Sequence, residues 1–150
     1  MIVMQSPRDD EQALSLLARL PPGAYIYSHP KYGLTVLNAT LTATARRRGV
    51  LPAGAKISKI TAGDITAIRH AAGSQWTLWD ASARHIRTSL AAGASGVVAT
   101  PLSHVPTRFP DRPVSVLQPA IDAVQEQLDR LPSRAARSRL LHDLASANSD

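Results

Sequence analysis

The sequence contains no cysteine. A disulfide framework, a thiolate metal site and a cysteine nucleophile are therefore excluded, and a cytoplasmic location is the expectation. Aromatic residues make up only 4% of the chain, which leaves little for a platform that stacks nucleic-acid bases. The sequence also lacks a run of about 18 apolar residues and a basic leader, so neither a membrane span nor a signal peptide is predicted.

Basic residues outnumber acidic ones, with 17 Lys and Arg against 11 Asp and Glu, and the net charge is +6. A balance of this sign suits a polyanionic partner. The basic residues are, however, spread through the predicted helices. The one run, Arg46 to Arg48, comes just before Gly49, where cations complement the dipole of a helix end. We therefore do not expect nucleic-acid binding, and a basic binding module remains a third functional hypothesis.

Hydrophobic periodicity predicts five strands that alternate with four helices. The strands are expected at 2–4, 24–27, 55–59, 75–79 and 96–100, and the helices at 9–20, 35–48, 64–72 and 82–92. This alternation implies a parallel sheet with right-handed crossovers. Five such units fit either a partial (β/α)8 TIM barrel, about strands 4 to 8, or a five-stranded, open, doubly wound parallel sheet. The pattern alone leaves both open.

The whole chain, 1–150, is expected to form a single domain, because a hydrophobic content of 44% is enough for a core. Residues 1–100 would form the strand-containing part, and the proline-rich stretch 101–113 is predicted to be a loop. Residues 114–146 are predicted to form two C-terminal helices. The first of them is expected to begin with a capping box made by Ser115 and Gln118.

Lys59 is the first candidate for a functional residue. In a strand over 55–59 the side chains alternate between faces, so Lys59 would share a face with the apolar Ala55 and Ile57. It would end that strand, at the edge where parallel α/β folds build their active sites. An amine held among apolar side chains loses part of its preference for the charged form and can attack a carbonyl carbon. The alternative interpretation is a solvated lysine at the rim of the sheet.

No metal site and no cofactor are predicted. His29, His70, His85 and His104 show no metal-ligand spacing. Asp64 is interpreted as the N-cap of the helix that follows Lys59.

Three segments of the chain together resemble one enzyme family. They are Tyr27-Ser28-His29-Pro30, Lys59-Ile60-Thr61-Ala62-Gly63-Asp64 and Gly93-Ala94-Ser95-Gly96-Val97-Val98-Ala99. Their order and spacing resemble the pattern after the fifth, sixth and eighth barrel strands of the dihydrodipicolinate synthase and N-acetylneuraminate lyase family. Members of that family are class I aldolases, which form a Schiff base with a keto acid on a lysine. The resemblance therefore implies a TIM barrel and a pyruvate-like 2-keto acid as substrate.

The resemblance also implies roles for four residues. Lys59 would condense with the keto carbon of pyruvate or a related 2-keto acid, and Tyr27 would relay protons during that reaction. Val98 would lie beside the bound keto acid, with a core valine as the alternative. Lys31 would bind a second carboxylate of the substrate, with a solvated loop lysine as the alternative.

The resemblance has gaps as well. Met1 corresponds to about the fourth strand of the family's barrel, so the first three strands and the segment that binds the keto acid's carboxylate have no counterpart. Ser28 replaces an asparagine, and Trp79 stands where the family has a glycine. The first functional hypothesis is accordingly a truncated aldolase, and the second is a non-catalytic remnant or partner subunit. A homo-oligomer or a complementing chain would supply the missing strands.

Overall fold

The computed structural model describes residues 1–4, 7–98, 100–101 and 114–147. The chain forms two compact units. The first comprises Met1–Ala81 and Thr88–Val98, and the second comprises Ser82–Arg87 and Ala99–Asp150. Most of the predicted proline-rich loop, residues 102–113 with His104, lies outside the described residues, and so does Ala99 in the third family segment.

A five-stranded parallel sheet forms the centre of the first unit. Its strands are β1 (Ile2–Val3), β2 (Tyr25–Ser28), β3 (Gly54–Ile57), β4 (Thr77–Asp80) and β5 (Gly96–Val97). Each strand pairs with the next one along the chain, so the order in the sheet is β1-β2-β3-β4-β5. The sheet is open, and its strand order contains no reversal.

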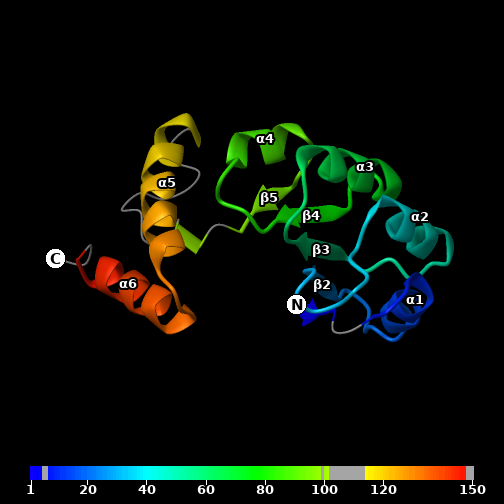
Figure 1. Cartoon of the computed structure of the whole chain (residues 1–150). Helices are drawn as coiled ribbons and strands as arrows, with labels where there is room; N and C mark the ends of the chain where they lie inside the picture. Colours follow the sequence, from blue (N-terminus) through cyan, green and yellow to red (C-terminus); the bar gives the residue numbers. More distant parts are fainter. Residues whose placement is uncertain (5–6, 99, 102–113, 148–150) are drawn as a thin grey trace. The chain divides into compact units, whose positions relative to one another are not determined.

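Helices connect successive strands. They are α1 (Asp10–Ala18), α2 (Ala39–Arg47), α3 (Ala62–Ala72) and α4 (Ile86–Ala91). Figure 1 shows α1, α2 and α3 next to one another along one face of the sheet, and α1 contacts α2, which contacts α3. A doubly wound sheet would reverse its strand order and carry helices on both faces. The prediction of a partial barrel is therefore confirmed, and the doubly wound alternative is wrong.

The two faces of the sheet differ in character. The face toward the helices is buried and mostly apolar, with Ile26, Ile57 and Leu78 at its centre. The opposite face, which would line the interior of a closed barrel, carries half-buried polar and aromatic side chains in register across the strands. They are Tyr25, Tyr27, Lys56, Thr77 and Trp79. We call this second face the open face.

Local capping sets where the helices begin. The side chain of Asn38 accepts a hydrogen bond from the Leu41 backbone N–H at 2.9 Å, so α2 begins at Ala39, four residues later than predicted. The N-cap of α3 is Thr61, and Asp64 completes a capping box at the third helical position. The prediction of Asp64 as N-cap is thus wrong. Hydrogen bonds from the Thr61 N–H and hydroxyl lower the pKa of the Asp64 carboxyl.

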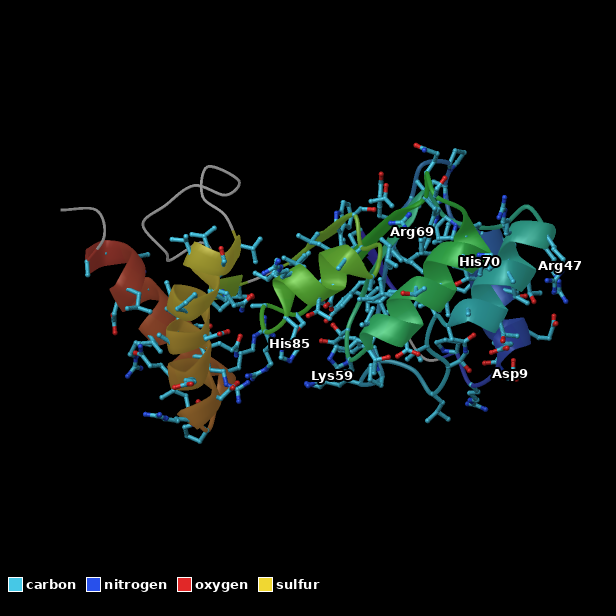
Figure 2. The ribbon with its side chains drawn as sticks, turned by 90° about the horizontal axis from the view of Figure 1, so that it is seen from above. Asp9, Arg47, Lys59, Arg69, His70 and His85 are labelled. Carbon is cyan, nitrogen blue, oxygen red and sulfur yellow. The ribbon has the colours of Figure 1, made fainter. Side chains whose placement is uncertain are left out.

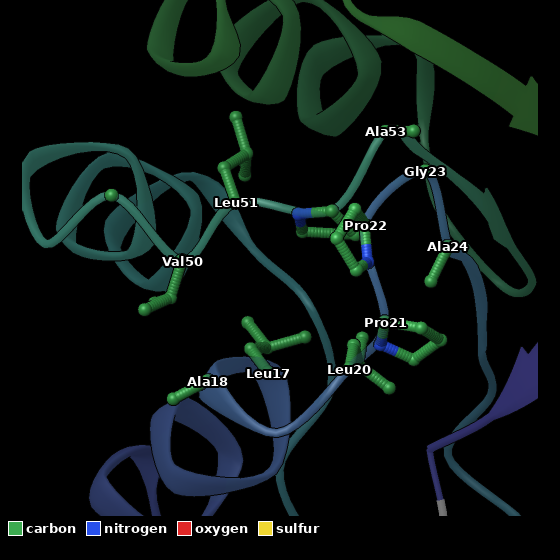
Figure 3. A pocket seen from close by; sticks show the side chains of 12 residues that line it. Leu17, Ala18, Leu20, Pro21, Pro22, Gly23, Ala24, Val50, Leu51 and Ala53 are labelled. Carbon is green, nitrogen blue, oxygen red and sulfur yellow. The ribbon is translucent and has the colours of Figure 1, made fainter.

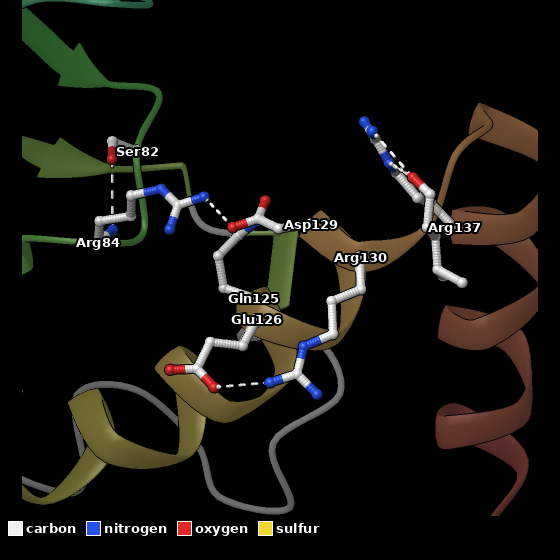
Figure 4. Close-up of polar contacts among 8 residues, drawn as sticks. Ser82, Arg84, Gln125, Glu126, Asp129, Arg130 and Arg137 are labelled. Carbon is white, nitrogen blue, oxygen red and sulfur yellow. Dashed lines mark hydrogen bonds and ion pairs between the residues drawn. The ribbon is translucent and has the colours of Figure 1, made fainter.

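The second unit contains α5 (Val114–Arg130) and α6 (Arg134–Ala147). The predicted capping box at its start is wrong, because Ser115 lies inside α5. Gln118 instead donates to the backbone oxygen of Ala83 at 2.7 Å. An ion pair between Arg84 and Asp129 joins the same two segments, as Figure 4 shows. Within the described residues, no helix combines the length and the apolar character needed to span a membrane.

Arg69, at the end of α3, ties together the loops at the amino edge of the sheet. Its guanidinium donates to the backbone oxygens of Gly93 at 2.7 Å and of Trp76, and to the Ser95 hydroxyl at 2.8 Å. Lysine cannot reproduce this fork of donors. We expect Arg69→Lys to lower the free energy of unfolding by about 1–3 kcal/mol, because buried carbonyls lose their partners. Urea unfolding followed by circular dichroism measures this change.

Arg47→Lys on α2 is the matched control. Arg47 is exposed, and its guanidinium donates to the hydroxyl of Thr44, a neighbour on the same helix. A conservative change at such a position costs less than about 0.5 kcal/mol. Equal stability losses in the two variants would contradict the structural role assigned to Arg69.

Candidate functional site

Three side chains meet on the open face where β2 and β3 end. Tyr27 and Lys56 are paired in register, and the Lys56 Nζ lies over the Tyr27 ring, 4.3 Å from its centroid. The Tyr27 hydroxyl is 3.0 Å from the Oγ of Ser58. An amine and an aliphatic hydroxyl therefore both contact the same phenol side chain. The contacts lie at the carboxyl edge of a parallel sheet, where α/β folds place their active sites.

Lys59 does not occupy the position predicted for it. The strand ends at Ile57, Ser58 follows, and Lys59 has a backbone φ of 61°. This left-handed conformation turns the chain away from the sheet, so Lys59 is exposed instead of sharing the buried face of Ile57. Figure 2 shows Lys59 and Arg69 at opposite sides of the first unit. The prediction of a shared apolar face is wrong because it extended the strand two residues too far.

Positive charge surrounds the contact between Tyr27 and Lys56. Burial is the main cause that lowers the pKa of His29, and the ammonium groups of Lys59, Lys31 and Lys56 lower it further. The His29 Nδ1 accepts a hydrogen bond from the Lys31 backbone N–H at 2.9 Å, so the Nε2 of the neutral ring carries its proton. The site thus offers three ammonium groups and one neutral N–H donor, a setting that suits an anionic ligand.

Aromatic side chains occupy the rest of the open face. Trp79 stacks on Tyr25 with 5.1 Å between ring centroids, and the two rings come from strands that flank Gly54. Val98 follows β5 and alternates with Gly96, which is paired with Trp79, so Val98 shares the open face. It is 39% exposed and is separated from Lys56 by the strand that carries Trp79. The structure thus brings Tyr27, Lys56 and the cationic groups together, with Val98 two strands away.

Cavities found elsewhere among the described residues are not lined by a lysine or a tyrosine, and two of them illustrate this. One, of about 230 Å³, lies at the amino ends of β2 and β3 and is shown in Figure 3. Apolar side chains and backbone line it, without a titratable side chain, and among them are Leu17, Pro22 and Val50. The other, of about 360 Å³, lies between α5 and α6. Its Arg137 donates to the Leu131 backbone oxygen, which caps α5 (Figure 4).

Lys56 and Ser58 were not among the predicted site residues. In a strand over 55–59 they lie on the face opposite the one expected for Lys59. One feature of the sequence points to them: both are polar and alternate with Ala55 and Ile57, in a strand that a barrel would cover on both sides. Polar residues at alternate positions of such a strand indicate a lined interior. Among the described residues, no group of three His, Asp or Glu side chains is placed to hold a metal ion.

Comparisons with known proteins connect this fold to solved structures. No protein-family model matches the chain, and no curated protein sequence matches it significantly. The 2-keto 3-deoxygluconate aldolase from Picrophilus torridus matches with a TM-score of 0.69 and 13% identity, over 96% of this chain and 58% of that one. A putative dihydrodipicolinate synthase family protein from Coccidioides immitis matches with a TM-score of 0.57 and 14% identity, over 98% of this chain and 44% of that one.

A monomeric dihydrodipicolinate synthase variant gives a TM-score of 0.59 and 15% identity, over 98% of this chain and 64% of that one. The chain thus spans 44–64% of these three structures. At such low identity the likeness shows the fold. It supports a relationship to this group of aldolases at the level of architecture.

Proposed function

We propose that this chain acts as a Schiff-base aldolase or lyase on a pyruvate-like 2-keto acid, in the manner of the dihydrodipicolinate synthase family. The observation that carries the proposal is the Lys56 amine over the Tyr27 ring, 4.3 Å from its centroid, at the carboxyl edge of the strands. The structural similarity between this chain and the solved aldolases supports the partial-barrel architecture that the proposal assumes. A cytoplasmic location belongs to the same proposal.

The reacting lysine first gives up the proton of its ammonium form, which leaves a neutral amine. Its lone pair attacks the keto carbon, and the carbonyl oxygen takes up a proton to become a hydroxyl while the nitrogen gives one up. The hydroxyl takes up a second proton and leaves as water, and the nitrogen gives up its remaining hydrogen when the imine forms. The Tyr27 hydroxyl is the group placed to give and recover these protons. Lys31 and Lys59, which act electrostatically on the same His29, attract the carboxylate of the keto acid.

Two lysines are candidates for the reacting amine. Lys59 has the spacing to Gly63 and Asp64 that the family motif requires, and Lys56 has the contact with Tyr27. We favour Lys56, because its amine contacts the side chain of Tyr27, which would donate the proton. Lys59 then contributes positive charge at the entrance of the site, together with Lys31.

Borohydride trapping tests the proposal. The folded protein is incubated with pyruvate and sodium borohydride, and intact mass spectrometry detects the reduced adduct. Peptide mapping then locates the modified lysine, which is expected to be Lys56. An adduct on Lys59 would show that Lys59, and not Lys56, is the reacting amine. The proposed reaction would then still hold. Folded protein that forms no adduct would contradict the proposed function.

A non-catalytic partner subunit is the second candidate function. The edge strand β1 and Met1 before it expose apolar side chains, with Met1 at 63%, Ile2 at 39% and Val3 at 37%. An edge strand of this kind is a surface on which another strand can pair. In this alternative, a complementing chain or a second copy covers the edge. Absence of the pyruvate adduct, together with a larger assembly in light scattering, would favour it over the aldolase.

A further inference from the structure

The Tyr27 hydroxyl has a fixed partner on its own face of the sheet. The Oγ of Ser58 lies 3.0 Å from it, and the Ser58 residue is only 8% exposed. The Ser58 backbone N–H also donates to the Ser28 backbone oxygen at 3.0 Å, which continues the β2 and β3 pairing by one residue. Ser58 is therefore held in place by the sheet, before the chain turns away at Lys59.

We infer that Ser58 is a positioning residue for proton transfer by Tyr27; this inference rests on the proposed function. When the phenol hydroxyl gives its proton to the substrate oxygen, it becomes a phenolate. The phenolate oxygen then needs a hydrogen-bond donor. The Ser58 O–H can turn to donate to it, and it can turn back to accept when Tyr27 recovers its proton. The substrate oxygen gains the proton that Tyr27 loses, and Tyr27 recovers a proton from the nitrogen of the intermediate. Ser58 only reorients its hydroxyl, so neither side chain undergoes a net change.

The other serine of this region has a different task. Ser28 is 1% exposed on the helix-facing side of the sheet, and its Oγ accepts a hydrogen bond from the Leu37 backbone N–H at 2.9 Å. Alternation of side chains places Ser28 and Tyr27 on opposite faces. Ser28 thus offers a control of the same residue type, in the same sheet, with a structural bond and without access to Tyr27.

The test compares Ser58→Ala, Ser58→Thr and Ser28→Ala with the wild type. Borohydride quenching at successive times gives the first-order rate of imine formation at saturating pyruvate, and a concentration series gives the half-saturating pyruvate concentration. We expect Ser58→Ala to slow the rate by about ten- to a hundredfold, less than most of the about 10²–10⁴-fold that a proton-transfer group itself contributes, because Ser58 acts through Tyr27. The half-saturating concentration should stay unchanged, and Ser58→Thr should restore most of the rate.

Ser28→Ala is expected to lower thermal stability and leave the rate of imine formation unchanged. A normal rate in Ser58→Ala would overturn the inference and leave the proposed function standing. A slow rate that threonine does not restore would also overturn it, because the loss would then reflect packing. A wild type that forms no adduct would overturn both the inference and the proposed function.

Discussion

Methionine in place of Lys56 is expected to eliminate the pyruvate adduct that borohydride traps on the wild-type protein. Lys56→Met retains the apolar stem that lies over the Tyr27 ring and removes the amine. The imine forms only on the reacting amine, so the loss of the adduct should be complete. Intact mass spectrometry after reduction measures the adduct, and circular dichroism verifies that the variant is folded.

Lys59→Gly is the matched variant for this experiment. Lys59 adopts a φ of 61°, a conformation that costs an ordinary residue about 1–2 kcal/mol and that glycine adopts freely. The variant should therefore be at least as stable as the wild type. It should also retain the adduct, with a higher half-saturating pyruvate concentration because one positive charge is lost. An adduct that persists in Lys56→Met and disappears in Lys59→Gly would show that the motif, and not the geometry, identifies the reacting lysine.

Alanine in place of Gly54 is expected to destabilise the protein by about 3 kcal/mol, the upper end of the usual cost of overpacking. A Cβ at this position would lie 2.5 Å from the Tyr25 ring, 2.7 Å from the Thr77 backbone oxygen and 2.8 Å from the Thr77 Cβ. The ring could move, but the backbone oxygen belongs to the neighbouring strand and moves only if the sheet spreads. Urea unfolding measures the loss.

Gly63→Ala provides the comparison for Gly54→Ala. Gly63 lies in the first turn of α3, and a Cβ there would meet only the Thr61 hydroxyl oxygen, at an ordinary 3.6 Å. Alanine favours the helix over glycine by up to about 1 kcal/mol. Gly63→Ala should therefore raise the free energy of unfolding, whereas Gly54→Ala should lower it. Equal stability of the Gly54→Ala variant and the wild type would show that β3 and β4 have room that the structure does not contain.

The alternation of strands and helices could be predicted from the sequence because it depends on local periodicity and on strong stops such as Gly73. The predicted first residues of the helices were less accurate, although the sequence contains capping signals for α2 and α3. Asn38 precedes α2, and Thr61 stands three residues before Asp64, which is the spacing of a capping box. The strand order depends on contacts between elements, so periodicity left the barrel and the doubly wound sheet equally open.

The candidate site was predicted in part for a similar reason. Tyr27 lies near the end of β2 as expected, although the strand runs one residue further than predicted, to Ser28. The predicted surroundings of Lys59 depended on where β3 ends, and the strand ends two residues earlier than predicted, at Ile57. Spacing to Gly63 and Asp64 favoured Lys59 but carried no information about the left-handed turn at that residue.

The sequential strand order has a consequence for how the first unit opens. Every strand pairs only with its neighbours along the chain, so the unit resembles a linear array in which stability is passed from one repeat to the next. Such arrays fray from their ends, and both end strands, β1 and β5, are only two residues long. Amide hydrogen exchange should accordingly be fastest at these two edges. Tyr27 and Lys56 lie on interior strands, so the pair proposed to react belongs to the part of the array that opens last.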